Sequence, residues 1–347
     1  MKKLLSVILA VIMFALPFTF SADAATKKAL PLSAGIDALR SEFDFAVAGE
    51  EEGYALDYCY YSPVGKSDKT KYPVVIFLHG IGHGAYPGSQ IDSVMAYWAS
   101  SELQSRWTDT GGAYIVLPRC PEDSFEYWNS SLVNPLRKMI DDFIKDNKAN
   151  VDTSRIFIGG SSAGGEMTWN MITTYPEYFA GAYPMSATGI MTSADVKAAK
   201  NVAVWIFASK LDPIVNYLTV TMPLWDKVCK YNANPKNCRL SSFGAVCNPD
   251  GKIAGENHRL FQTISYDFFT IDNKPYPNVE TEDGKGNTVN FKYPNGMISW
   301  MRGIHSNFTG KRTSEGEKTN FFEHFLIFFR NIFMKIGNII QKMLGFV

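Results

Sequence analysis

An apolar stretch, a glycine-rich turn and a helix-forming stretch follow one another directly between residues 155 and 175. Residues 155–158 have the character of a short strand that is buried on both faces. The sequence Gly160-Ser161-Ser162-Ala163-Gly164 comes next, and residues 164–175 are compatible with a helix. Because glycine has no side chain, such a turn can be very tight. A strand, a tight turn and a helix in this order favour a parallel sheet that is covered by helices.

The same alternation of strands and helices continues from residue 54 to residue 243. It predicts an α/β fold with a mostly parallel central sheet, and it argues against an all-α or all-β fold. Residues 270–297 are polar and contain glycine and proline, which indicates an inserted loop or hairpin. Further strands are expected at 54–61, 73–78, 113–117, 179–183, 202–207 and 239–243, and helices at 132–145 and 217–231.

The charge balance and the cysteine spacing limit the possible partners. The chain has 347 residues, with 34 Lys plus Arg against 34 Asp plus Glu, so no overall field attracts nucleic acid. The zinc-type cysteine spacing is absent, and we expect neither a metal nor a cofactor. Cys229, Cys238 and Cys247 lie close together in the sequence. They could form a local disulfide, or they could be buried free thiols. The other two cysteines are Cys59 and Cys120.

The N-terminal segment has the pattern of a bacterial secretory signal peptide. Two lysines precede an apolar run over residues 4–20, and Ala22-Asp23-Ala24 offers the small residues of a cleavage site. A membrane anchor is the alternative, but the run is short for a spanning helix. We therefore expect residues 1–25 to be removed and the protein to be secreted or associated with the cell surface.

The C-terminal segment has a different character from the rest of the chain. Residues 310–319 form a charged linker, and residues 320–347 show the apolar spacing of an amphipathic helix. Arg330 and Lys335 interrupt this run, which argues against a membrane-spanning helix. Such a helix could dock on its own domain, or it could bind a membrane surface or a second copy. The catalytic domain is then expected over residues 26–309.

Ser162 is the candidate nucleophile. The G-x-S-x-G pattern is weak alone, and an inert glycine–serine loop is the alternative. The strand before it and the helix after it supply the context that a nucleophile elbow requires. In that arrangement the hydroxyl stands at the carboxyl edge of the sheet. The Ala163 amide, at the start of the helix, can then donate to an oxyanion.

The second oxyanion donor is expected in residues 79–84, which follow the apolar run at 73–78. Small residues there let the backbone approach the reacting carbonyl, and we assign the donor to Ile81, with Gly82 as second choice. His79 is expected to have a structural role because it is fixed at the end of a strand.

An orienting acid and a base are expected after the nucleophile. Asp212 follows the strand expected at 202–207 and suits the carboxylate, although a simple turn aspartate before Pro213 is the alternative. His258 and His305 are both candidates for the base, and His324 lies in the C-terminal segment. The order of the elements favours His258, because only one loop separates it from the last expected strand.

These motifs together resemble the secreted esterase and peptidase branch of the α/β-hydrolase superfamily, which includes polyhydroxybutyrate-depolymerase-like and feruloyl-esterase-like proteins. The resemblance implies an α/β-hydrolase fold and a serine hydrolase. The chain departs from the family pattern at Ala163, where Met or Gln is common, and at Arg259, since a helix containing tryptophan usually follows the histidine. The residues that carry the resemblance are 72–80, 117–121 with Trp128, 151–165, 176–184 and 210–215.

The expected reaction is the cleavage of a carboxylic ester of the acyl-polysaccharide, polyester or lipid type through an acyl-enzyme. Cleavage of a peptide or amide bond on the same fold is an alternative, and so is a non-catalytic surface-binding protein. Tyr127, Trp128 and Trp169 are candidates for the substrate pocket, although isolated aromatic residues more often belong to the core.

Overall fold

The computed structural model describes residues 29–49, 55–67, 69–84, 86–91, 93–121, 127–187, 189 and 191–306. The expected signal peptide at 1–25, the linker at 310–319 and the amphipathic helix at 320–347 lie outside the described residues. Within the described ranges, none of the helices has the length and apolar character that crossing a membrane requires.

The centre of the molecule is one mixed sheet, in which nine strands are described in the order β1-β2-β4-β3-β5-β6-β7-β8-β9. Neighbours from β4 to β8 pair in parallel, whereas β1, β2 and β9 pair antiparallel at the two edges. The strands are β1 (Asp44–Ala48), β2 (Leu56–Tyr61), β3 (Tyr72–Leu78), β4 (Tyr114–Pro118), β5 (Val151–Ser161), β6 (Gly181–Met185), β7 (Ala203–Ser209), β8 (Arg239–Phe243) and β9 (Val279–Asp283).

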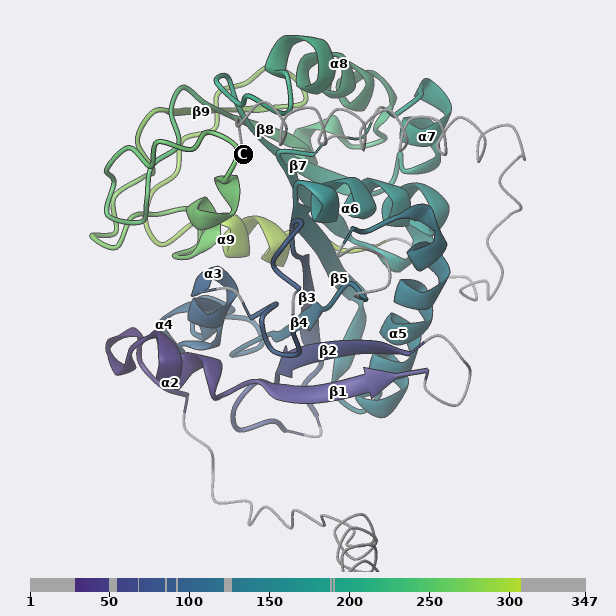
Figure 1. The fold of residues 1–347 in the computed structure, drawn as a ribbon, viewed down its shortest axis with the longest axis vertical. Coiled ribbons are helices and arrows are strands. Elements are labelled where there is room, and N and C mark those ends of the chain that lie inside the picture. Colours follow the sequence, from purple (N-terminus) through teal and green to yellow (C-terminus); the bar gives the residue numbers. More distant parts are fainter. Residues whose placement is uncertain are drawn as a thin grey trace, which may run out of the picture.

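Helices cover both faces of this sheet (Figure 1). Apolar residues of α5, α6, α7 and α8 pack on one face, and those of α3, α4 and α9 pack on the other. The helices are α2 (Ile36–Arg40), α3 (Ser93–Ala96), α4 (Ser101–Gln104), α5 (Val133–Asp146), α6 (Ala163–Thr174), α7 (Ser193–Ala198), α8 (Met222–Tyr231) and α9 (Met297–Arg302). A π-helical turn (Tyr217–Thr221) precedes α8, and a 3-10 helix (Leu260–Ile264) follows β8.

Strand β3 explains why the central strands have continuous apolar sequences. Val74, Ile76 and Leu78 face the core under α5 and α6, while Val75 and Phe77 face the opposite core. Since neighbouring side chains in a strand point to opposite faces, a strand covered on both sides needs an apolar residue at every position.

The structure confirms the expected parallel sheet and corrects some of its boundaries. Strand β8 has the expected bounds, whereas β6 begins two residues later than predicted. Strand β9 lies inside the polar segment at 270–297, where it pairs with β8. Strand β1 is not predicted by the sequence, because its five residues, Asp-Phe-Ala-Val-Ala, show no alternation of apolar and polar residues. Its side chains at the edge of the sheet are mostly exposed or half-buried.

Cys229, Cys238 and Cys247 are free thiols, so the local disulfide considered above does not form. Cys238 is buried in the core under α8, and Cys247 is buried in the core on the other side of the sheet. The sheet therefore separates these two thiols. Burial raises the pKa of the Cys238 thiol to about 12, which leaves it protonated and unreactive at neutral pH.

Candidate active site

Ser162 occupies a strained turn between β5 and α6. Its φ and ψ angles are 55° and −116°, a conformation that residues with side chains rarely adopt. The turn is also crowded, because a Cβ atom added to Gly164 would lie 2.1 Å from the carbonyl oxygen of Leu78. A Cβ atom on Gly160 would lie 2.5 Å from the same oxygen. Glycine at both positions therefore lets α6 start directly against β3, with Ser162 at the carboxyl edge of the sheet.

Ser162, His258 and Asp212 form one continuous series of hydrogen bonds. Ser162 Oγ lies 2.9 Å from His258 Nε2, and His258 Nδ1 lies 2.8 Å from Asp212 Oδ2 and 3.0 Å from Oδ1. When the Asp212 carboxylate accepts a hydrogen bond from Nδ1–H, the Nε2 lone pair is directed at the serine hydroxyl. The imidazole is thus oriented to take a proton from Ser162.

The Asp212 carboxylate is almost fully buried, with 1% of its side chain exposed. A buried charge requires partners, and Asp212 Oδ1 accepts hydrogen bonds from the Ile214 amide at 2.8 Å and the Val215 amide at 2.9 Å. Asp212 therefore does form the turn that was the alternative interpretation. The same turn fixes the carboxylate beneath His258, so the two interpretations are compatible.

His305 lies at the other end of the sheet. It is exposed, and the amide of the next residue, Ser306, bonds to the Ser154 carbonyl in the amino-terminal half of β5. His258, by contrast, lies in the loop that follows β8. Because parallel strands bring their carboxyl ends to the same edge, β5, β7 and β8 place Ser162, Asp212 and His258 together.

The loop at 79–84 passes beside the nucleophile. A Cβ atom on Gly80 would lie 3.7 Å from Ser162 Cβ, and Gly82 takes a φ of 82° in the turn that follows Ile81. The Ala163 amide is the first of α6, and amides of the first helical turn have no partner within their helix. Ile81 and Ala163 thus belong to the two backbone segments that flank Ser162.

His79 holds this loop in place through hydrogen bonds to its neighbours. It is buried, its Nε2 accepts from the Cys120 amide at 3.0 Å, and its Nδ1 donates to the Gly80 carbonyl at 2.7 Å. Trp128 Nε1 donates to the His79 carbonyl at 3.0 Å. These bonds connect the loop to β4 and to the residues after it, which agrees with a structural role for His79.

Two of the three aromatic candidates for the substrate pocket are core residues. Trp128 and Trp169 are fully buried, so neither ring is open to a substrate in this structure. Tyr127 is half-buried, and its hydroxyl donates to Glu166 Oε2 at 2.8 Å. Glu166 lies one turn of helix after Ser162. The sequence does not predict its place near the nucleophile, because a single carboxylate in a helix matches no motif.

The candidate active site is built from three side chains of the described residues. Among the described residues, we find no cluster of three or more His, Cys, Asp or Glu side chains arranged to hold a metal ion. The site contains a hydroxyl, an imidazole and a carboxylate in series, an arrangement that supports nucleophilic attack by serine.

No protein-family model and no curated protein sequence matches the chain. Among solved structures, it is similar to a thermostable esterase, with a TM-score of 0.51 and 26% identity over 59% of this chain and 55% of that one. This chain thus spans about half the length of that esterase. A second similar structure is the Thermogutta terrifontis esterase Est2, with a TM-score of 0.46 and 15% identity over 65% of this chain and 89% of that one. A third is the acetyl xylan esterase of Aspergillus awamori, with a TM-score of 0.39 and 17% identity over 54% and 78%.

The strand order, the strained serine turn and the likeness to the thermostable esterase agree with one another. They confirm the architecture that the sequence resemblance implied. The described part of this chain has the α/β-hydrolase fold of the kind found in esterases.

Proposed function

We propose that the protein is a serine hydrolase that cleaves carboxylic esters through an acyl-enzyme. The hydrogen-bonded series of Ser162, His258 and Asp212 carries this proposal. Ser162 Oγ attacks the acyl carbonyl while His258 Nε2 takes the hydroxyl proton. The amides of Ile81 and Ala163 bind the oxyanion of the tetrahedral intermediate. His258 then protonates the leaving alcohol, and water hydrolyses the acyl-enzyme by the same steps.

The loops around Ser162 favour a substrate with an apolar acyl or alcohol part. Ile81, Leu211 and Ile214 are exposed by 48%, 59% and 51%, although their side chains are apolar. Ile81 follows the glycine beside Ser162, and the other two flank Asp212. An apolar group of the substrate would cover these side chains on binding and so gain the free energy of removing them from water.

The proposal is tested with a fluorophosphonate probe and with p-nitrophenyl acetate. We expect the wild-type protein to be labelled and to release p-nitrophenol, and Ser162→Ala to lose both properties, because the probe and the ester need the serine hydroxyl. An aminoacyl p-nitroanilide is the matched amide substrate, and slower turnover is expected for it. If the wild-type protein is neither labelled nor active on either substrate, the proposal that it is a hydrolase is refuted. If the amide is turned over faster than the ester, the proposal that it prefers esters is refuted.

We also propose that the protein is exported and that its C-terminal segment keeps it at a surface. The patterns of residues 1–25 and 320–347 support this. After expression in a bacterium and fractionation, mass spectrometry should find a mature chain that begins at Thr26. We expect the full chain in the cell-surface fraction and a chain ending at residue 318 in the medium. An intact N-terminus in the cytoplasm would contradict export.

A further inference from the structure

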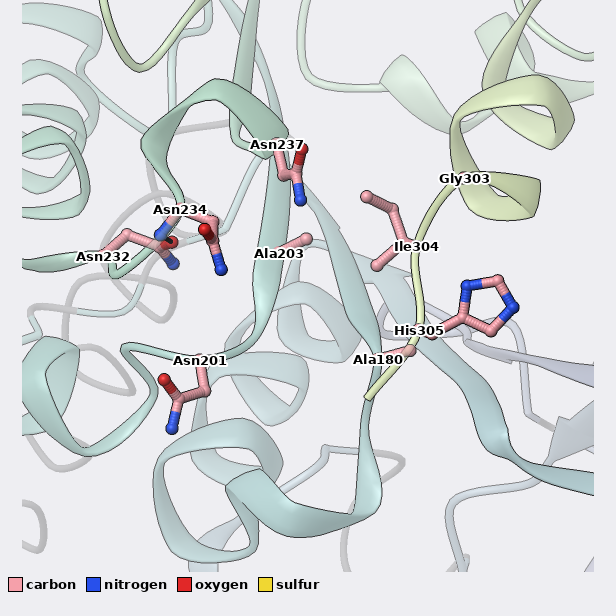
Figure 2. Close-up of a pocket in the computed structure, with 9 residues that line it drawn as sticks. All are labelled: Ala180, Asn201, Ala203, Asn232, Asn234, Asn237, Gly303, Ile304 and His305. Carbon is pink, nitrogen blue, oxygen red and sulfur yellow. Dashed lines mark hydrogen bonds between the residues drawn. The ribbon is translucent and has the colours of Figure 1, made fainter. Parts of the chain in front are cut away.

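A hollow of about 240 Å³ lies between the amino ends of β6 and β7 and the residues that follow α9 (Figure 2). Ala180, just before β6, and Ala203, the first residue of β7, are part of its lining. The side chains around it are four asparagines, Asn201, Asn232, Asn234 and Asn237, together with Ile304 and His305.

This hollow is separate from the candidate active site. Ala203 and Ser209 are the two ends of β7, and at about 3.3 Å per residue the strand separates them by roughly 20 Å. The hollow lies at the amino end of this strand, whereas Asp212 follows its carboxyl end. A ligand of a few sugar-sized units in the hollow would therefore not touch Ser162.

Hydrogen bonds fix the backbone of the wall that carries the asparagines. Asn232 Nδ2 donates to the Val202 carbonyl at 2.8 Å, and Asn232 Oδ1 accepts from the Asn234 amide at 2.8 Å. The Asn237 amide donates to the Asn234 carbonyl at 2.9 Å, and Trp300 Nε1 donates to the Asn237 carbonyl at 2.8 Å. The wall is thus shaped before any ligand arrives, which reduces the entropy cost of binding.

Three side-chain amides on this fixed wall remain available. Asn201, Asn234 and Asn237 are exposed, and their amide groups make no hydrogen bond to other residues that the structure describes. Figure 2 shows Asn234 and Asn237 across the hollow from Ile304, with the His305 ring turned away from the amides. The hollow therefore presents polar amide groups on one side, and the buried Ile304 closes it on the other.

The chemistry of this lining selects a neutral ligand that is rich in hydroxyl groups. Each amide offers both donors and an acceptor, and a hydroxyl group can pair with either. None of the residues that line the hollow is Asp, Glu, Lys or Arg, and the ring of His305 is turned away from the amides (Figure 2). A charged ligand beside the amides would therefore lose water without gaining a counter-charge. Ile304 is only 6% exposed, so it closes the inner side of the hollow, and recognition rests on the amides. The volume is below the roughly 300 Å³ of small drug-sized pockets.

We propose that this hollow is a second binding site, which holds one sugar unit of a neutral oligosaccharide. The site would attach the protein to a glycan at a distance from Ser162. The proposal stands on the hollow alone and does not depend on the reaction that Ser162 performs.

Isothermal titration calorimetry of the mature chain with the Ser162→Ala substitution tests this, since that variant cannot consume an acylated ligand. The probes are neutral hexasaccharides of glucose, xylose and mannose, with hexagalacturonate as the charged comparison and sorbitol as the open-chain polyol. We expect at least one neutral hexasaccharide to bind, and neither hexagalacturonate nor sorbitol to bind. The loss of two hydrogen bonds in Asn234→Ala/Asn237→Ala should weaken binding about tenfold or more.

Asn295→Ala is the matched control, because Asn295 is exposed, lies outside the hollow and makes no side-chain hydrogen bond within the described residues. It should bind as the parent does. With Ser162 restored, the double variant should still turn over p-nitrophenyl acetate at the parental rate, which shows that it is folded. The proposal is overturned if no neutral hexasaccharide binds, if hexagalacturonate or sorbitol binds equally well, or if the double variant retains the parental affinity.

Discussion

Replacing His258 with alanine is expected to lower kcat/KM for p-nitrophenyl acetate by about 10,000-fold or more. The Ser162 hydroxyl is a weak nucleophile unless a base removes its proton during the attack. His258 Nε2, 2.9 Å from Ser162 Oγ, is placed to be that base, and Asp212 holds it in the required tautomer. Stopped-flow or steady-state measurement of p-nitrophenol release at neutral pH gives the ratio.

His305→Ala is the control for this substitution, because it removes the other histidine that the sequence offered as a base. His305 is exposed and follows α9 at the opposite end of the sheet, so turnover should be unchanged. Equal losses in both variants would mean that the measured activity does not come from the site around Ser162. Loss in His305→Ala alone would require a different base and a rearranged site.

Gly164→Ala is expected to destabilise the protein by more than about 4 kcal/mol or to prevent it from folding. The added Cβ atom would lie 2.1 Å from the Leu78 carbonyl oxygen and 2.7 Å from that of His79. Both oxygens belong to the backbone at the end of β3, so no side chain can move aside to make room. Strand β3 and helix α6 would have to separate in the middle of the core. Urea unfolding followed by tryptophan fluorescence measures this loss of stability.

Gly244→Ala is the matched control, since a Cβ atom there would meet the Asn278 carbonyl oxygen at an ordinary 3.7 Å. Its free energy of unfolding should stay within about 0.5 kcal/mol of the parent. A Gly164→Ala protein as stable as Gly244→Ala would show that α6 does not start against β3 as described.

The central sheet could be predicted from sequence because burial on both faces leaves an unbroken apolar run. β3 and β7 are of this kind, and every residue in each is buried. The edges could not be predicted in the same way. β1 has four apolar residues in five, but they do not alternate with polar residues, and Phe45 and Val47 are exposed. β9 is mostly polar, so neither sequence distinguishes a strand from a loop.

The residues of the candidate active site could be nominated because each follows a recognisable strand. The base was harder to choose, since His258 and His305 are chemically alike and only the order of the elements separates them. Burial is not visible in the sequence, so the sequence cannot show that Trp128 and Trp169 fill the core and do not line a pocket. The asparagine-lined hollow had no signal, because its residues come from separate loops and follow no spacing.

The hydrogen bond between Ser162 and His258 joins residues 96 positions apart in the chain. It can form only after β5, β6, β7 and β8 have paired in parallel and the loops at their carboxyl ends have reached their native conformation. Such non-local pairing is the slow part of folding, because the chain loses the entropy of large loops before the contacts compensate for it. During refolding, the rate of ester turnover would therefore report the fraction of molecules in which β5 to β8 are fully paired. Secondary structure formed earlier, such as an isolated α5, would not contribute to it.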